Sequence, residues 1–105
     1  MLNYVITYYG FPRFERPEDG AAYMAKWRAW MDEVGEAMIN PGTPMSSGKT
    51  LSAAGVSDTS RGEPLTGFSI LSADSLDAAL ALARGCPHLA HGTIDVAQAM
   101  DMGMT

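Results

Sequence analysis

Two histidines, His88 and His91, lie close together in this chain of 105 residues. A histidine titrates near neutral pH, so His88 is the first candidate for a general base that acts on a small substrate. An acidic side chain would have to orient it, and Asp74 and Asp95 are the conceivable partners. Asp74 also suits a helix cap, and Asp95 an alternating strand position. The catalytic hypothesis is therefore His88 with Asp74, against a loop histidine that only packs and forms local hydrogen bonds.

Metal, thiol and nucleotide chemistry are less well supported. His88 and His91 are three residues apart, but they follow a predicted helix end and no third ligand is in view, so we predict no metal site. Cys86 follows the same helix end, whose partial negative charge disfavours a thiolate, and we expect a small buried side chain. The sequence has neither a glycine-rich phosphate loop nor a nucleophile elbow. We expect no cofactor.

Large aromatic side chains gather in two segments. Tyr23, Trp27 and Trp30 recur at helical spacing, and Tyr8 belongs to an apolar run near the N-terminus. These four side chains would line an apolar pocket between a helix and a sheet, suited to an aromatic small molecule. The alternative is plain core, although buried phenol and indole tips usually need a polar partner. We predict that Tyr8, Tyr23, Trp27 and Trp30 bind a ligand.

The hydrophobic pattern predicts the elements that must position these residues. Residues 2–9 are rich in β-branched and aromatic side chains and form a strand, and apolar spacings of three and four predict a helix over residues 19–39. Residues 45–56 form an edge strand, and residues 65–73 a central strand. A second helix opens with Asp74 as its cap and closes near Arg84, and residues 92–100 contain the last strand.

The order strand, helix, strand, strand, helix, strand is typical of a ferredoxin-like α+β fold, and the length fits one domain over residues 1–105. Two helices cover one face of such a sheet. The first strand nevertheless has sizeable apolar or aromatic groups on both faces, with Tyr4 and Ile6 on one and Val5 and Tyr9 on the other. We therefore expect a second copy on the bare face, which gives a homodimer stacked sheet to sheet.

Composition excludes several partners. The net charge of −5 is the wrong sign for gripping nucleic acid or an anionic membrane surface. No apolar stretch reaches the roughly 20 residues needed to cross a bilayer. The single cysteine and the absence of a signal peptide at this N-terminus favour a reducing compartment, so we expect a cytoplasmic protein.

Residues 67–89, GFSILSADSLDAALALARGCPHL, and the following GTIDV at residues 92–96 resemble the DGPF-type branch of the YCII-related family. The resemblance implies ferredoxin-like protomers that form a dimeric α+β barrel, in small stand-alone proteins of unassigned activity. The signature that names the branch is missing, and RGEP at residues 61–64 stands roughly in its place. In other members a histidine on the first helix has been proposed to pair with an aspartate, whereas this helix reads KWRAW at residues 26–30.

These observations predict a cytoplasmic homodimer that binds a small, aromatic ligand between the first helix and the sheet. Two alternatives stay open. One is a cofactor-independent enzyme that abstracts a proton or acts as a lyase, with His88 as the general base. The other is a homodimeric scaffold for protein interactions.

Overall fold

The computed structural model describes residues 1–46, 48–58 and 63–100. Its elements, in chain order, are β1 (Leu2–Tyr9), α1 (Pro17–Val34), the short 3-10 helix η1 (Gly35–Ala37), β2 (Met38–Asn40), β3 (Thr50–Ser52), β4 (Gly55–Ser57), β5 (Leu65–Ala73), α2 (Leu76–Ala83), the 3-10 helix η2 (Pro87–Ala90) and β6 (Thr93–Gln98).

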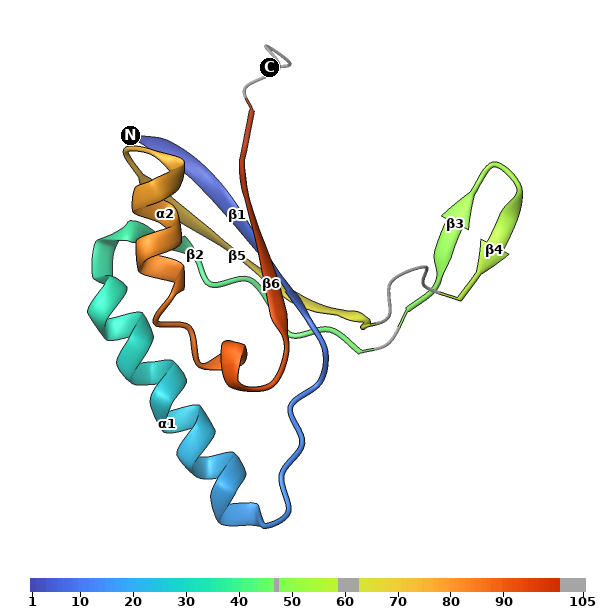
Figure 1. Ribbon diagram of the computed structural model, residues 1–105, viewed down its shortest axis with the longest axis horizontal. Coiled ribbons are helices and arrows are strands. Elements are labelled where there is room, and N and C mark those ends of the chain that lie inside the picture. Colours follow the sequence, from blue (N-terminus) through green and yellow to red (C-terminus); the bar gives the residue numbers. More distant parts are fainter. Residues whose placement is uncertain (47, 59–62, 101–105) are drawn as a thin grey trace.

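The main sheet has the strand order β2-β5-β1-β6, and each pair of neighbours is antiparallel. With α1 and α2, these strands form the βαββαβ core of a ferredoxin-like α+β fold, which confirms the predicted fold class (Figure 1). In the single chain the sheet is open and is not closed into a barrel. The strands β3 and β4 form a separate two-stranded sheet, inserted between β2 and β5.

The core lies between the helices and one face of the sheet. Alternation along β1 buries Tyr4, Ile6 and Tyr8, and the facing residues of α1 include Trp30 and Val34. On the opposite face, Val5, Thr7 and Tyr9 are only half-buried. Both faces of β1 thus carry sizeable side chains, but only one is covered by the chain's own helices.

The first helix differs from the prediction at both ends. It starts at Pro17, which suits a first helical position because proline lacks an N–H, and it ends before Gly35, whose φ of +59° favours glycine. Residues 35–39, expected to be helical, instead belong to η1 and to the short edge strand β2, which ends at Asn40. Gly42 turns the chain after β2 with φ of +74°. A Cβ there would lie 1.7 Å from the Phe68 carbonyl oxygen of β5, so only glycine fits.

The predicted edge strand over residues 45–56 is wrong, because β2 takes the edge position beside β5. Residues 50–52 and 55–57 instead pair with each other across a turn at Ala53 and Ala54, as the strands β3 and β4, and Gly55 begins β4 with a positive φ. The resulting hairpin projects beyond the end of the main sheet (Figure 1). The connection that was expected over residues 57–64 includes residues 59–62, which lie outside the described residues.

The cap of the second helix is also corrected. Ser75, rather than Asp74, has the extended backbone of an N-cap, and its Oγ accepts a hydrogen bond of 3.1 Å from the Ala78 N–H. Within the described part of the chain, neither helix combines the length and apolar character that crossing a bilayer requires.

Candidate functional site

His88 is buried in η2, the 3-10 helix that precedes β6. Its Nε2 lies 2.8 Å from the carbonyl oxygen of Tyr9, and since a carbonyl only accepts, Nε2 donates the hydrogen. The imidazole also meets the Tyr8 ring edge to face, with centroids 5.5 Å apart. Gly92 makes this arrangement possible, because a Cβ there would lie 2.8 Å from His88 Nε2. His88 therefore ties η2 to the end of β1.

Asp74 does not approach His88. Asp74 follows Ala73, which pairs with Leu2 at the start of β1, whereas His88 contacts Tyr9 at the end of this eight-residue strand. A strand advances about 3.4 Å per residue, so the two ends are on the order of 20 Å apart. The structure therefore keeps the two residues of the catalytic hypothesis at opposite ends of the sheet, with Asp74 exposed.

The four predicted ligand residues form a chain of ring contacts. Trp27 meets Tyr8 at 5.4 Å, Trp30 at 5.5 Å and Tyr23 at 6.2 Å, in each case edge to face. The Tyr8 hydroxyl donates to Ser69 Oγ at 2.8 Å. Tyr8 and Trp30 are almost completely buried, so their rings fill the space between α1 and the sheet.

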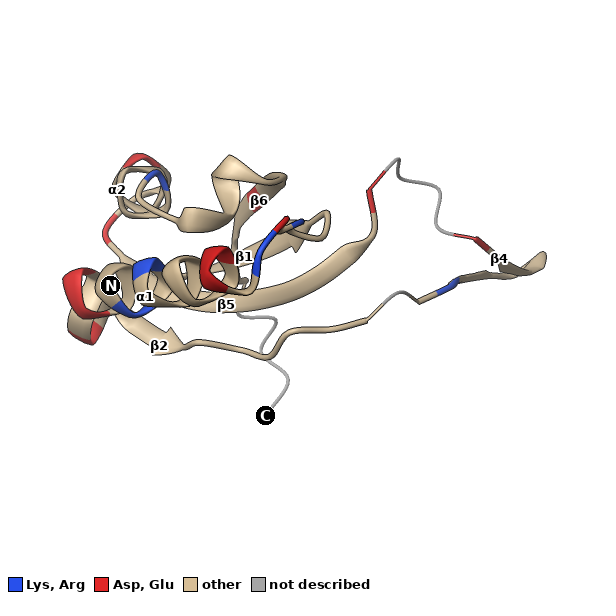
Figure 2. Ribbon diagram, turned by 90° about the horizontal axis from the view of Figure 1, so that it is seen from below, with Lys and Arg blue, Asp and Glu red and all other residues tan. Residues whose placement is uncertain are grey.

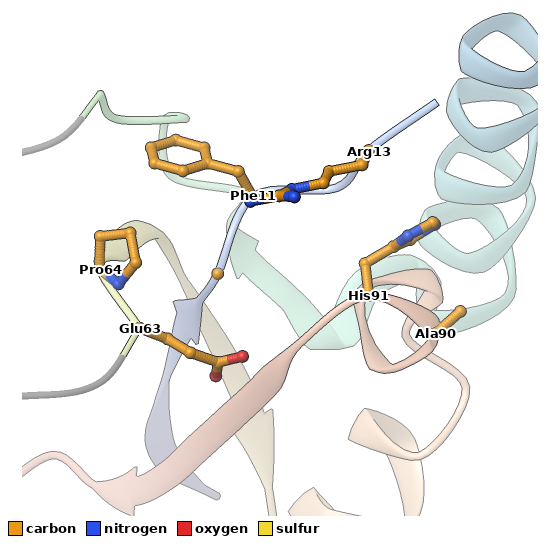
Figure 3. A pocket seen from close by; sticks show the side chains of 7 residues that line it. Phe11, Arg13, Glu63, Pro64, Ala90 and His91 are labelled. Carbon is orange, nitrogen blue, oxygen red and sulfur yellow. The ribbon is translucent and has the colours of Figure 1, made fainter. Parts of the chain in front are cut away.

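Two hollows lie at the end of the sheet, beside the loop that joins β1 to α1. Their volumes are about 430 and 400 Å³, within the usual range of ligand sites. Arg13 and His91 line both hollows, and Figure 3 shows these two side chains in the first hollow. The first is completed by Gly10, Phe11, Glu63, Pro64 and Ala90, and the second by Phe14, Glu15, Asp19, Ala22, Tyr23 and Lys26.

Two hydrogen bonds hold the wall of the first hollow. Gly10, with φ of +95°, donates its N–H to the Pro64 carbonyl at 2.9 Å. Thr93 Oγ1 donates to Glu63 Oε2 at 3.1 Å, which fixes the carboxylate above the start of β6. A Cβ at Gly10 would lie 3.3 Å from Glu63 Oε1, so a glycine leaves room for this acid. Glu63 is thus a positioned carboxylate in the hollow.

The second hollow continues the ring contacts of α1. His91 lies edge-on to Tyr23, with centroids 4.9 Å apart, and to Phe14, at 5.5 Å. Burial raises the pKa of Tyr23, so its hydroxyl stays protonated at neutral pH. Among the described residues Arg13 forms no salt bridge, whereas Asp19 is engaged by Arg16 at 3.7 Å. A guanidinium without an acidic partner beside aromatic rings is suited to an anionic ring compound.

The profile of the YCII-related domain matches residues 2–102. The chain belongs to the YCII-related domain family. The resemblance predicted from residues 67–96 is therefore confirmed at the level of the family, and the assignment to the DGPF-type branch stays a prediction. No curated protein matches this YCII-related domain.

A solved structure with the same fold is 5-chloro-2-hydroxyhydroquinone dehydrochlorinase from Burkholderia phenoliruptrix, in complex with 2,5-dihydroxybenzoquinone. The TM-score is 0.60, the alignment covers 97% of each chain, and 16% of the residues are identical. At 16% identity, this similarity shows the fold of the YCII-related domain alone.

Arg13 and Glu63 were not predicted from the sequence, and His91 was considered there only as a candidate metal ligand and rejected. One available signal was the segment from Phe11 to Phe14, which places an arginine between two phenylalanines directly after a strand. A second was Glu63, which stands near the place of the branch signature. Residues 61 and 62 of that signature segment lie outside the described residues of this YCII-related domain, while Glu63 and Pro64 line the first hollow.

Cys86 is buried in the core of the YCII-related domain, as expected. Burial raises the pKa of the thiol from 9.0 to about 11, so the folded chain holds this proton more tightly than the unfolded chain. In the residues that the structure describes, no three His, Cys, Asp or Glu side chains are grouped to hold a metal ion.

We expect the free energy of unfolding to fall as the pH rises from about 9 to about 11. In this window the unfolded thiol loses its proton and the folded thiol keeps it, which favours unfolding by up to about 2 kcal/mol. Urea midpoints at pH 8 and 10.5 measure the change. Cys86→Ala is the control and should lose less stability over the same interval, since only the raised pKa values of Tyr8 and Tyr23 remain. Equal losses in the two proteins would contradict this prediction.

Proposed function

We propose that this YCII-related domain binds a small planar ring compound carrying an acidic oxygen, such as a phenolate or carboxylate, at Arg13 and His91. The observation that carries the proposal is that these two side chains line both hollows. Arg13 provides the positive charge, and its planar guanidinium can donate two hydrogen bonds to one carboxylate. The solved dehydrochlorinase of the same fold holds a dihydroxylated quinone, a compound of the same class.

The proposed position differs from the pocket expected between the first helix and the sheet. Tyr8 and Trp30 fill that space with their own rings and hydrogen bonds. Tyr23 lines the second hollow, and the ring of Trp27 contacts the ring of Tyr23 edge to face. Phe11, with 43% of its surface exposed, adds an accessible ring face to the first hollow. The proposal therefore retains the aromatic ligand predicted from the sequence, but it assigns the binding position to the hollows at the end of the sheet.

Proton transfer to the bound compound is the second candidate function. Glu63 and His91 are two titratable side chains in one hollow, as an enzyme that removes and returns a proton requires. His88 is a weaker candidate for the base, because its Nε2 is committed to the Tyr9 carbonyl. Proton transfer would require that the compound binds first, so the binding experiment described below also tests this second function.

We also propose that two copies associate through the face of the sheet that the helices leave bare. Val5, Phe68 and Ile70 lie on this face and are half-buried in the single chain. An apolar patch on one face of a sheet is typical of an interface, and two-fold pairing would cover both copies alike.

Binding is tested by titrating the protein with 2,5-dihydroxybenzoquinone in a calorimeter. We expect Arg13→Ala to weaken binding by about 10- to 100-fold, because a charge-assisted hydrogen bond to the ligand contributes about 1.5–3 kcal/mol. Arg28→Ala removes the same charge from an exposed position of α1 outside both hollows and should bind as the unmodified protein does.

The two histidine ring signals in an NMR titration localise the ligand. The His91 signals should shift on addition of the quinone, while those of buried His88 should stay in place. Unchanged binding by Arg13→Ala, or a shift confined to His88, would contradict the proposed site. If the unmodified protein binds neither this quinone nor 2,5-dihydroxybenzoate, the small-molecule function fails and the scaffold alternative gains.

A further inference from the structure

The β3–β4 hairpin projects from the body of the protein. Figure 1 shows it beyond the end of the main sheet, and Figure 2 shows the same separation from α1 and α2 in a view turned by 90°. Leu51 and Val56 are cross-strand partners in this hairpin, so their side chains share one face. They are 78% and 69% exposed. The hairpin thus carries an apolar pair that nothing in the described chain covers.

Little within the chain stabilises this hairpin. A two-stranded hairpin alone is marginally stable in water at best, because it buries almost no apolar surface. Lys49 and Asp58 form an ion pair at its open end, but both side chains are largely exposed and such pairs contribute little. A projecting hairpin with an exposed leucine and valine therefore indicates a surface that is covered by another molecule.

The dimensions of the whole chain point the same way. The radius of gyration is 15.2 Å, against about 13 Å for a compact domain of this length. The accessible surface is 7270 Å², whereas a monomeric protein of this mass exposes about 5,700 Å². A standard interface buries about 800 Å² per partner, so the additional surface is enough for one.

The bare face of the sheet is too small to form that interface by itself. The strands β5, β1 and β6 lie side by side, and β1 is eight residues long. With strands about 4.8 Å apart and about 3.4 Å per residue, this face measures roughly 400 Å². That is about half of what each partner in a stable dimer buries. The hairpin offers further uncovered apolar surface to a second copy, in the strongly exposed side chains of Leu51 and Val56.

We propose that the β3–β4 hairpin is a dimerisation arm, whose Leu51–Val56 face packs against a second copy of this chain. The inference rests on the homodimer proposed above and assigns the arm as part of its interface. Two-fold symmetry lets each copy give one arm and receive one, so both apolar pairs are covered together. Residues 48–58 contain one lysine and one aspartate, so the arm itself has no net charge and is not repelled by the net charge of −5 of a second copy.

The test compares two double variants that place the same charges on opposite faces of the hairpin. Leu51→Asp/Val56→Asp puts two carboxylates on the apolar face, and Ser52→Asp/Ser57→Asp puts two on the other face. Light scattering and sedimentation equilibrium over 1–100 μM give the mass and the dimer dissociation constant. We expect the first variant to raise that constant at least 10-fold and the second to leave it within about 2-fold. Circular dichroism checks that both variants keep the fold.

The outcomes separate the arm from the dimer. If the unmodified protein is a monomer of 11.2 kDa at every concentration, the dimer and the arm both fail. If it is a dimer and the first variant dimerises equally well, the arm is overturned while the dimer through the sheet stands. If both variants weaken dimerisation equally, the arm is also overturned, because the effect would then not depend on the Leu51–Val56 face. Binding of the quinone is measured separately and does not enter this comparison.

Discussion

Replacing Trp30 by alanine is expected to lower the free energy of unfolding by about 3–5 kcal/mol. Trp30 is 3% exposed and packs with Ile6 and Leu71 in the core between α1 and the sheet. Its Nε1 also donates a 3.0 Å hydrogen bond to the Leu82 carbonyl, which joins α1 to α2. A small domain is stable by about 5–15 kcal/mol, so this variant loses a large part of the total. Urea unfolding followed by circular dichroism measures the loss.

Trp27→Ala is the matched control on the same helix. Trp27 is only partly buried and makes edge contacts with neighbouring rings, so we expect a loss of about 1–2 kcal/mol. Losses of the same size for the two tryptophans would mean that the core is not centred on Trp30. A loss below about 1 kcal/mol for Trp30→Ala would contradict its placement.

Gly92→Ala is expected to destabilise the protein by about 2–4 kcal/mol, through overpacking and the loss of one buried hydrogen bond. The new Cβ would lie 2.1 Å from the Tyr9 carbonyl oxygen and 2.8 Å from His88 Nε2. These are the two atoms of the hydrogen bond between η2 and β1, so the methyl group must break it or move the backbone. Urea midpoints measure the destabilisation, and a shift of the His88 ring signals in NMR reports the broken contact.

Gly48→Ala serves as the control for the loss of a glycine. Nothing lies within 4 Å of the Cβ it would add, and a substitution there should change stability by less than about 0.5 kcal/mol. The His88 signals should stay in place. If Gly92→Ala were as stable as Gly48→Ala, the close approach of residue 92 to β1 would be refuted.

Strong local patterns made part of the fold predictable. The alternating run of β1 has the bounds Leu2–Tyr9 that its composition predicts, and the second long strand, β5, likewise spans the expected residues. Both lie in the middle of the sheet, where burial enforces the period of two. The edge and the hairpin were misassigned, because serine and glycine dilute the pattern over residues 45–57 and short strands have little pattern to read.

The cap of α2 illustrates a different limit. Asp74 and Ser75 both have a side-chain oxygen that can accept from a helix N-terminus. The choice depends on which of the two residues has the extended backbone at the point where the helix begins. Ser75 has it, with φ of −156° and ψ of 167°. Side-chain chemistry alone could not distinguish them.

Periodicity and residue type predicted the α+β class, the order of the core elements and the burial of Cys86, and the resemblance of residues 67–96 indicated the family. Periodicity and residue type act over a few neighbouring positions, so they can be recognised in a single sequence. Two features emerge only from the folded structure: Asp74 and His88 lie at opposite ends of β1, and Arg13, Glu63 and His91 share a hollow. The reason is that strand pairing brings together residues that are far apart in the chain. The pairing of Thr93 with Tyr9 places η2 beside the loop after β1. A pattern of neighbouring residues does not show which distant segments will pair.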